Sequence, residues 1–512
     1  MLVNVRSVAN VGLLTVPVEV EVDVAAQGFP GVTIVGLPSK AVEEARERVK
    51  TAIGNSGLDF PPKKITINLA PADLPKDGAA YDLPIAVGIL AASAQCSEKS
   101  AQGAIFYGEL GLDGALRATK GVLLVGLHVQ KNGKRIFVPE ESANEAAAIE
   151  GIEVYPVRNL KELVDHLNNV KEIKRLSHLE IKELVEDSVA DFDLAEVAGQ
   201  EQAKRALSIA AAGGHNLLMW GPPGTGKTML ARAMPGILPP LAAAEALEVT
   251  RIYSVAGMLD PGESLLRRRP FRSPHHGVSA AGMIGGGSNP TPGEVSLAHL
   301  GVLFLDEMAE FPRSVLEGLR QPMEDGTVGI VRAAAHVEYP ASFTLLAAIN
   351  PCPCGYLGHP KRECKCTERQ IRKYRARLSG PILDRIDLHV HVPAVEIDKL
   401  SLQNSNINLA AAGQNSKEIR KNVVRARKIQ ETRFKADGFY TNSQMHNKQV
   451  KKYCQLDGET ERILRLAVEK YDLSARAYFR LIKVARTIAD LADSVHIAAS
   501  HMAEALQYKQ LI

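Results

Sequence analysis

The stretch "LLMWGPPGTGKTMLARAM", residues 217–234, decides the fold of the centre of this chain. It begins with an apolar run that predicts a β-strand and ends with a pattern that predicts a helix. Between the two lie Gly221, Pro222, Pro223, Gly224, Thr225, Gly226, Lys227 and Thr228. This order matches the phosphate loop G-x-x-x-x-G-K-[ST] in its required strand–loop–helix context, in which backbone N–H groups and the helix N-terminus face phosphates. The alternative is a chance glycine turn, which does not account for the flanking strand and helix.

Two residues of this loop and two acids further along predict a site for ATP and Mg²⁺. Lys227 would reach the β- and γ-phosphates, and Thr228 would hold Mg²⁺. The run "GVLFLDE", residues 301–307, predicts a strand that ends in two acids. Asp306 would be a Mg²⁺ ligand beside Thr228, and Glu307 would polarise the attacking water. The alternative is a strand that ends in a solvated acid pair.

Asn350 and Arg385 are two further candidates for the nucleotide site. Asn350 ends the apolar run "FTLLAAIN". Burying an unbonded amide would cost about 1–3 kcal/mol, so a γ-phosphate or its attacking water would satisfy this side chain. Arg385 lies between Asp384 and Asp387 at a strand-like boundary. It either pairs with those acids or acts as an arginine finger that reaches the nucleotide of a neighbouring subunit.

The composition is that of a soluble globular protein with more than one hydrophobic core. The chain has 512 residues, of which 46% are hydrophobic and 23% charged. This length predicts about three domains. No apolar run is long enough to span a bilayer, and the N-terminus lacks the pattern of a secretory signal, so we expect a cytoplasmic protein without a membrane partner. The net charge of +3 does not indicate nucleic-acid binding, so any DNA affinity must come from local patches.

The pattern of strands and helices predicts an α/β protein in three parts. Residues 1–170 mix strands with helices, and a charged, partly helical connector follows at 171–190. Residues 191–395 alternate apolar strands, helices and glycine-rich turns, which predicts a parallel sheet. The last part, residues 396–512, begins with a polar loop and is then helical to its end.

Together these motifs resemble the AAA+ ATPases of the magnesium-chelatase-like branch, and most of all the ComM/YifB family of competence-related proteins. The resemblance covers essentially the whole chain and also rests on "VAGQEQAKRAL" (197–207), "RPFRSPHH" (269–276), "NPCPCGY" (350–356) and "SGPILDRID" (379–387). It implies a homo-hexameric ring with ATP at the subunit interfaces, with Asn350 as sensor 1 and Arg385 as arginine finger. The run "LSARAYFRLIKVARTIADL" (473–491) resembles the C-terminal lid and puts Arg476 in the sensor-2 position. The family is associated with DNA branch migration during natural transformation, which implies single-stranded and branched DNA as partners, with recombination proteins as further candidates.

The N-terminal part resembles the Lon-protease C-terminal domain, which has a ribosomal-S5-like α+β fold. The run "PKDGAAYDLPIAVGIL" (75–90) is similar to the region around the Lon nucleophile, but Ala80 stands where the serine would be. Ala80 carries no nucleophile, so peptide hydrolysis by that mechanism is impossible. In the later lysine-bearing region the expected position is Leu123, and Lys120 is three residues away. Both departures predict a non-proteolytic scaffold.

A ring that moves DNA needs loops that line its pore, and two stretches are candidates. The first, residues 267–288, combines a flexible glycine run with Arg267, Arg268, Arg269, Arg272, His275 and His276. The second is an apparent hairpin at 327–340 with Arg332 near its tip. Cationic loops would bind phosphates without sequence preference and with strong salt dependence. The alternatives are a solvated basic surface or ion pairs at a subunit interface.

Four of the six cysteines lie together in "INPCPCGYLGHPKRECKC" (349–366): Cys352, Cys354, Cys364 and Cys366. Four thiolates suit tetrahedral Zn²⁺, although two C-x-C pairs are tighter than the usual spacing. An iron–sulfur cluster and four unligated thiols remain alternatives. The loop between the pairs and the helical pattern "TERQIRKYRARL" (367–378) are rich in Lys and Arg. We expect a structural zinc knob that supports a subunit contact or DNA access.

These observations favour an ATP-driven DNA translocase that moves branched DNA. A metal-chelatase-type ATPase or a remodelling chaperone that acts on a protein partner is the main alternative, although the Lon-like part and the four cysteines argue against a chelatase subunit. An ATP-dependent protease is disfavoured by Ala80. A non-enzymatic DNA-binding scaffold leaves the phosphate loop unexplained.

Overall fold

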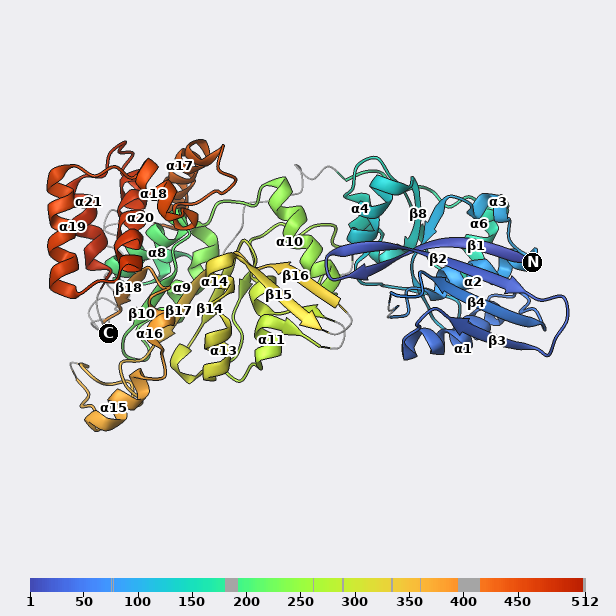
Figure 1. Ribbon diagram of the computed structural model, residues 1–512, viewed down its shortest axis with the longest axis horizontal. Coiled ribbons are helices and arrows are strands. Elements are labelled where there is room, and N and C mark those ends of the chain that lie inside the picture. The colour runs from blue at the N-terminus through green and yellow to red at the C-terminus, as the bar shows by residue number, and fades with distance from the viewer. Residues whose placement is uncertain are drawn as a thin grey trace.

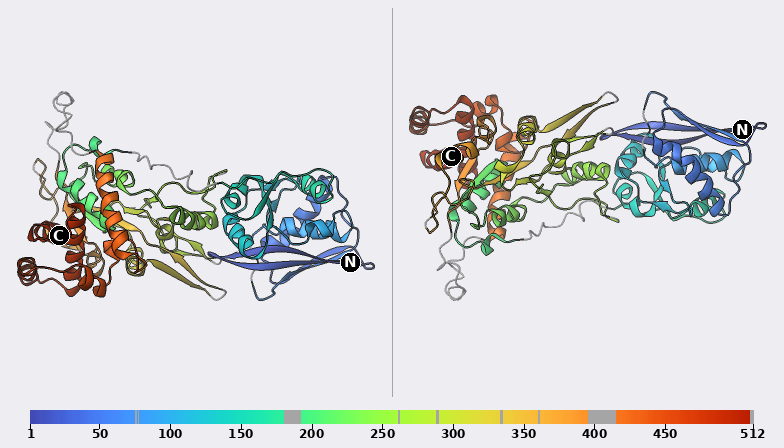
Figure 2. Two further views of the ribbon diagram at one scale, coloured as in Figure 1. Left: turned by 90° about the horizontal axis from the view of Figure 1, so that it is seen from above. Right: turned by 90° about the horizontal axis from the view of Figure 1, so that it is seen from below.

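The computed structural model describes residues 1–74, 76, 78–179, 192–260, 262–287, 290–332, 335–359, 361–394 and 415–509, with the backbone alone at 331, 332, 335 and 336. The molecule is elongated, with the N-terminal sheet at one end and the C-terminal helices at the other (Figure 1). The two views from above and below show the same division (Figure 2).

The N-terminal part is built on a seven-stranded mixed sheet in the order β3-β4-β2-β1-β5-β8-β9. Strand β2 alternates buried valines with exposed acids, which is the pattern of a sheet with one face on a core. The strands are β1 (Leu2–Val11), β2 (Leu14–Val24), β3 (Gly31–Val35), β4 (Lys64–Ala70), β5 (Ala104–Phe106), β8 (Arg135–Pro139) and β9 (Glu153–Val157), with a small pair β6 (Glu109–Leu110) and β7 (Leu116–Arg117). The helices are α1 (Lys40–Asn55), α2 (Asp82–Ala92), α3 (Glu98–Ala101), α4 (Val122–Asn132), α5 (Ala143–Ala147) and α6 (Leu160–Leu167).

The central part confirms the predicted parallel sheet. Its five strands run in the order β11-β14-β17-β10-β18, and every neighbouring pair is parallel. They are β10 (Leu217–Trp220), β11 (Phe271–Arg272), β14 (Val302–Leu305), β17 (Thr344–Ile349) and β18 (Leu388–His391). Strands β14 and β17 are buried along their whole length, as expected for a sheet covered on both faces.

Helices and two antiparallel strand pairs surround the parallel sheet. The helices are α8 (Glu201–Gly213), α9 (Lys227–Ile237), α10 (Ala243–Ala256), α11 (Ala280–Ile284), α12 (Glu294–Leu297), α13 (Arg313–Gly318), α14 (Pro322–Asp325), α15 (Glu368–Arg375) and α16 (Gly380–Leu383). The strand pairs are β12 (Gly285–Gly286) with β13 (Thr291–Pro292), and the hairpin β15 (Thr327–Arg332) with β16 (Ala335–Pro340). In Figure 1, α15 lies on a lobe that projects from the body of the molecule.

The C-terminal part is helical, as the sequence predicts. It comprises α17 (Ser416–Phe434), α18 (Asn447–Tyr453), α19 (Gly458–Tyr471), α20 (Ala475–Leu491) and α21 (Ala499–Gln507). Its core is continuous with that of the parallel sheet, because Val423 and Ile488 belong to the same buried cluster as Leu217. Short 3-10 turns occur at Glu140–Ser142, Leu194–Glu196, Met308–Glu310 and Asn442–Gln444.

The N-terminal part contacts the central part through the turn between β1 and β2. A Cβ on Gly12 would lie 2.1 Å from Cγ1 of Val337 in β16, so the turn rests directly on the β15–β16 hairpin. Nearby, Arg251 of α10 donates to the carbonyl of Leu13 at 3.2 Å. The base of the N-terminal sheet and the hairpin that the sequence singled out are therefore in contact.

The described beginning of the connector predicted at 171–190 packs on the N-terminal part. Residues 172–179 form no helix, and the Leu176 and Leu179 amides bond to the carbonyls of Val154 and Ala147. Ile173 is buried in the N-terminal core. The helical part of the predicted connector stays a prediction, because residues 180–191 lie outside the described residues, as do residues 395–414, which include most of the predicted polar loop.

Candidate functional site

The carboxyl ends of the parallel strands bring the predicted nucleotide residues together. Trp220 is paired with Ile349, and Leu305 with Ala347, so β10, β14 and β17 end at the same edge of the sheet. The phosphate loop follows β10, the two acids follow β14, and Asn350 follows β17. This edge is where open α/β sheets bind their ligands.

The phosphate loop lies between a strand and a helix, as predicted, and the residue just after β18 packs closely against its first residue. A Cβ on Gly221 would lie 2.1 Å from the carbonyl oxygen of Val392, so no larger residue fits there. Thr225 is buried and its hydroxyl donates to the carbonyl of Pro222 at 3.1 Å. Helix α9 begins at Lys227, as the strand–loop–helix pattern requires.

Lys227 lies inside the loop, with its ammonium group held by oxygens. Nζ donates to the carbonyls of Gly221 at 2.8 Å and Pro222 at 2.7 Å, and lies 3.4 Å from Oδ1 of Asn350. Burial lowers the pKa of Lys227 to about 8, although the charges of Asp306 and Glu307 oppose this shift. An amine so desolvated gains more from a phosphate than a solvated one would.

The predicted magnesium ligands are in contact. The Thr228 hydroxyl donates to Oδ2 of Asp306 at 2.9 Å, although the two residues lie on separate segments. Glu307 follows in a left-handed conformation with φ of +50°, which is unusual for a glutamate and is typical of functional sites. Its side chain is exposed at the edge where the loop lies. A hydroxyl and a carboxylate in contact are oxygen ligands of the kind that Mg²⁺ prefers.

Arg385 lies at the opposite edge of the sheet from the phosphate loop of its own chain, because it precedes β18. It does not pair with Asp384 or Asp387. Instead Nη2 forms an ion pair with Glu324 at 2.8 Å, Nη1 donates to the carbonyl of Pro381 at 2.7 Å, and only 5% of the residue is exposed.

Arg476 at the start of α20 binds the same carboxylate. Its Nη2 lies 2.5 Å from Oε1 of Glu324, whose other oxygen pairs with Arg385. Burial opposes ionisation of Glu324, but the hydrogen bond and charge of Arg385 and the charge of Arg476 lower its pKa below the usual value. The two arginines therefore form one ionic unit, away from the phosphate loop of their own chain. No motif in the sequence indicates Glu324, which lies on the short helix α14.

Gln200 is a second residue that sequence reasoning missed. It has a left-handed backbone with φ of +60° just before α8. Its amide donates to the carbonyl of Pro393 at 2.8 Å and lies 3.4 Å from that of Thr225. Gln200 thus ties the loop before α8 to the phosphate loop and to the end of β18. The segment "VAGQEQ" carries a family resemblance, but spacing along the chain does not predict its contacts.

The first predicted DNA loop contains arginines of two kinds. Arg269 is held by the carbonyls of Pro239 and Leu300, both at 2.7 Å, and by Glu245 at 2.8 Å. Arg272 forms a bidentate pair with Glu294 at 2.7 and 2.8 Å. These contacts favour a structural role for both residues. The ion pairs lie within the chain, whereas the alternative predicted from the sequence is ion pairs at a subunit interface.

The other members of that loop are more accessible. Arg268 and His275 are exposed, whereas Arg267 and His276 are half-buried. The two histidine rings lie 3.9 Å apart between centroids. Among the described residues, the cysteine cluster alone gathers three or more metal-ligating side chains, so the histidines do not form such a group there.

The second predicted DNA loop is a hairpin, as expected. Strands β15 and β16 are antiparallel, and Arg332 is the last residue of β15, opposite Ala335. The side chain of Arg332 and residues 333–334 lie outside the described residues.

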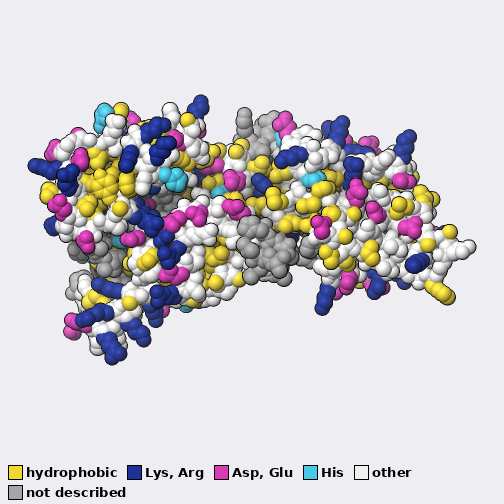
Figure 3. All heavy atoms as spheres, viewed as in Figure 1, with side chains coloured by type: hydrophobic (Ala, Val, Ile, Leu, Met, Phe, Trp, Pro, Cys, Tyr) yellow, Lys and Arg dark blue, Asp and Glu magenta, His cyan; other side chains and the backbone are white. Residues whose placement is uncertain are grey.

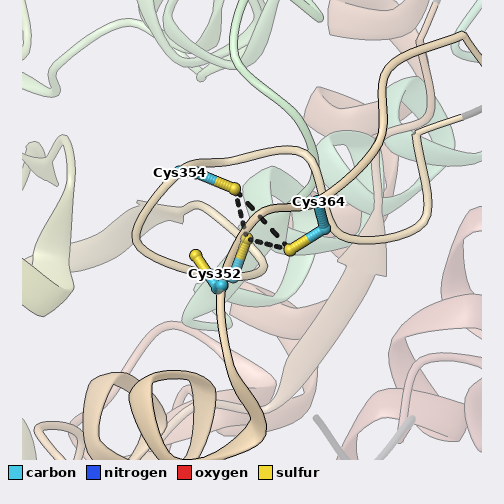
Figure 4. Close-up of side chains that lie close together, drawn as sticks. Cys352, Cys354 and Cys364 are labelled. Carbon is cyan, nitrogen blue, oxygen red and sulfur yellow. Dashed lines mark hydrogen bonds between the residues drawn. The ribbon is translucent and has the colours of Figure 1, made fainter.

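The four clustered cysteines form one group, and Figure 4 shows the thiols of Cys352, Cys354 and Cys364 pointing toward one another. Sγ of Cys352 lies 3.4 Å from that of Cys354 and 3.6 Å from that of Cys364, and all four ligand atoms lie within 4.8 Å of one another. A tetrahedral site with Zn–S bonds of about 2.3 Å has sulfur–sulfur edges of about 3.8 Å, so the donor set fits a single ion. Disulfides are excluded by these distances, and an iron–sulfur cluster of several irons would hold its cysteines further apart.

The remaining two thiols are different. Cys96 and Cys454 are buried far from the cluster in sequence, and burial raises the pKa of each to about 12. They are inert packing residues.

The positions that resemble the Lon active site line a cavity of about 780 Å³. Ala80, Lys120 and Tyr107 are among its lining residues. Leu123, at the expected lysine position, is fully buried. A nucleophile is therefore missing from this cavity at the predicted position.

The phosphate loop, the acids after β14 and the asparagine after β17 define a P-loop nucleotide-binding protein of the AAA+ class. Family profiles support this class along the chain: magnesium chelatase, subunit ChlI matches residues 193–400, subunit ChlI of Mg-chelatase matches residues 20–142, and the ChlI C-terminal profile matches residues 413–509.

Full-length relatives narrow the class to one family. The chain is 44% identical to YifB of Salmonella typhimurium over 511 residues, covering 99% of this chain and 97% of that protein. It is 42% identical to the competence protein ComM of Haemophilus influenzae over 515 residues, with the same coverage. The chain belongs to the ComM/YifB family of magnesium-chelatase-like AAA+ proteins.

Two further findings concern the broader architecture. A similarity of 23% over 288 residues links half of the chain to half of Lon protease 2 of Bacillus subtilis. In the parts of the chain that the structure describes, no helix has both the length and the apolar character needed to cross a bilayer.

Proposed function

We propose that this protein is an ATP-hydrolysing motor that works as a homo-hexamer in the cytoplasm and moves branched DNA during recombination. The ATPase part rests on two contacts at one edge of the sheet. The Thr228 hydroxyl lies 2.9 Å from Oδ2 of Asp306. Nζ of Lys227 lies 3.4 Å from Oδ1 of Asn350. The DNA part rests on membership of the ComM/YifB family, since ComM of Haemophilus influenzae is named a competence protein. Branch migration with single-stranded and branched DNA is the activity we assign.

The roles of the residues follow from their placement. The phosphate loop and Lys227 bind the phosphates of ATP, and Thr228 and Asp306 hold Mg²⁺. Glu307 accepts a proton from the attacking water, and Asn350 orients that water or the γ-phosphate.

Arg385 and Arg476 act on the nucleotide of a neighbouring subunit. Their shared partner Glu324 lies at the opposite sheet edge from the phosphate loop of the same chain, which supports action across an interface rather than within one chain. An arginine supplied in trans stabilises the charge that develops during phosphoryl transfer.

The remaining parts are assigned supporting roles. We take residues 1–170 as a non-proteolytic Lon-like domain, 171–190 as a connector, 191–395 as the AAA+ core and 396–512 as the lid. Cys352, Cys354, Cys364 and Cys366 bind one Zn²⁺, whose four thiolate ligands would be fixed without an open position, so the ion is structural.

The experiment is a comparison of Glu307→Gln with Glu310→Gln. Glu310 lies three residues further along, is also exposed and pairs with Arg377, so it is a matched control. We expect Glu307→Gln to bind ATP but to hydrolyse it about 100-fold or more slowly, since a general base contributes at least this much. Normal turnover by Glu307→Gln would contradict the ATPase assignment.

The competing function is an ATPase that remodels a protein partner, as the chelatase profiles allow. Branch migration is tested on a synthetic Holliday junction or a forked duplex with ATP. A protein partner that stimulates ATP hydrolysis, with no effect of any DNA, would favour the competing function.

A further inference from the structure

The lobe that follows Asn350 carries the densest positive charge in this region. Residues 361–377 contain eight Lys and Arg side chains and two Glu, a net of +6 against +3 for the whole chain. The eight are Lys361, Arg362, Lys365, Arg369, Arg372, Lys373, Arg375 and Arg377, and all are exposed. In Figure 3 dark blue side chains gather over this lobe.

Most of this charge is not neutralised within the chain. Arg377 pairs with Glu310 at 2.5 Å and Arg372 with Glu368 at 2.8 Å. Arg362 donates to the Tyr356 hydroxyl and lies over the Tyr356 ring. Among the described residues, the other five basic side chains have no ion-pair partner within reach. The five are Lys361, Lys365, Arg369, Lys373 and Arg375. A protein surface that concentrates like charges without partners gains by binding a polyanion.

The lobe is rigidly built, so the charges are held in place. The cysteine cluster closes the loop at its base, with Cys352 fully buried. Helix α15 starts with a capping box between Thr367 and Gln370. Tyr374 on its buried side and Leu378 just after its end belong to a hydrophobic core next to the parallel sheet. Arg369 and Lys373, one helical turn apart, project from the other side.

The lobe also contacts the nucleotide site. A Cβ on Gly355, in the turn between the first two cysteines and the rest of the loop, would lie 2.8 Å from Cδ of Pro223 in the phosphate loop. The Tyr374 hydroxyl is within hydrogen-bond reach of the Asn350 backbone. A ligand on this lobe thus sits on a unit that touches both the phosphate loop and Asn350.

We infer that the basic face of this lobe binds the sugar-phosphate backbone of DNA, outside the two loops predicted to line the pore. The inference rests on the proposed DNA-motor function and names a second DNA contact of the same motor. The face offers Lys and Arg head groups, which bind phosphates by charge, so recognition is independent of sequence. DNA bound there would lie on a lobe that contacts the phosphate loop through Gly355 and the Asn350 backbone through Tyr374.

The test uses the full chain with Arg369→Gln, Lys373→Gln and Arg375→Gln combined. The control combines Lys50→Gln, Lys63→Gln and Lys99→Gln, which removes the same charge from exposed lysines of the N-terminal part. Binding of a fluorescein-labelled oligothymidylate is measured between about 50 and 200 mM KCl. Melting temperature, zinc content and sedimentation of each protein are measured in parallel.

We expect the lobe variant to bind at least about 10-fold more weakly, with the slope of log affinity against log salt smaller by about two, as three lost phosphate contacts predict for a single strand. The control variant should match the wild type in both. Equal affinity and slope in the lobe variant would overturn the inference. So would a loss of affinity that accompanies loss of the oligomer, because the face would then be a subunit contact. A wild-type protein that binds no DNA would instead refute the proposed function itself.

Discussion

The contact between the cysteine lobe and the phosphate loop predicts that Gly355→Ala weakens nucleotide binding. At Gly355 the backbone φ is +83°, and a Cβ would lie 2.8 and 3.2 Å from Cδ and Cγ of Pro223. Carbon atoms pack at about 3.5–4.0 Å, so the loop must move by roughly 0.7 Å or more to admit the methyl group. Pro223 belongs to the phosphate loop, so this movement changes the shape of the site where ATP binds.

Gly358 provides the matched control for this prediction. Its φ is +78°, almost the same as that of Gly355, but a Cβ there would meet nothing within 4 Å. Alanine in this left-handed region costs about 1–2 kcal/mol at either position, so both variants should lose similar stability. Only Gly355→Ala also displaces the phosphate loop.

The assay is titration of each protein with a fluorescent ATP analogue in the presence of Mg²⁺. We expect Gly355→Ala to raise the dissociation constant about 10-fold, which is about 1.4 kcal/mol, and Gly358→Ala to leave it near the wild-type value. A dissociation constant of Gly355→Ala at the wild-type value would refute the coupling between the lobe and the phosphate loop. An equal rise in both would mean that lobe stability, not the Pro223 contact, controls nucleotide binding.

Three further predictions concern pH, the first basic loop and the metal. Burial raises the pKa of Glu145 from 4.5 to about 7, against the hydrogen bonds it accepts from Ser254 and the Leu123 amide. The folded state thus holds this proton more tightly than the unfolded chain, and stability should fall by up to about 3 kcal/mol as pH rises from 4.5 through 7. Glu145→Gln should remove that dependence in denaturant melts at pH 5 and pH 8, and an unchanged dependence would contradict the assignment. Arg269→Ala should lower the free energy of unfolding by about 2 kcal/mol or more, because it leaves two carbonyls and Glu245 without their partner, whereas exposed Arg268→Ala should change it by less than about 0.5 kcal/mol. Elemental analysis should find about one zinc per chain and none after Cys352→Ser with Cys364→Ser, and a metal-free wild type with a fully folded double variant would exclude the site.

The nucleotide site was predictable because its signals are local. The phosphate loop, Asp306 and Asn350 each follow an apolar strand, and parallel strands of one sheet end at the same edge. The convergence of the cysteines was predictable from their clustering in the chain for the same reason.

The contacts that tie the site together were not predictable. Glu324 meets Arg385 and Arg476 across segments that are far apart in sequence, and Pro223 meets Gly355 in the same way. Spacing carries no information about such pairs, because the order of strands in the sheet decides which loops become neighbours.

The basic loop at 267–288 shows a related limit. A run of arginines has the same appearance in sequence whether its side chains face solvent or cap carbonyls. Arg269 donates to the carbonyls of Pro239 and Leu300, and Arg272 pairs with Glu294. Only the fold distinguishes these two residues from the exposed Arg268.

If the protein is an ATP-hydrolysing DNA motor, as we propose, DNA should stimulate its hydrolysis of ATP. The most direct test is the steady-state rate of ATP hydrolysis by the wild-type chain with and without single-stranded and forked DNA, with Glu307→Gln as the blank. We expect both DNAs to raise the rate severalfold and Glu307→Gln to stay inactive in all three conditions. A rate that is the same with and without DNA would contradict the account.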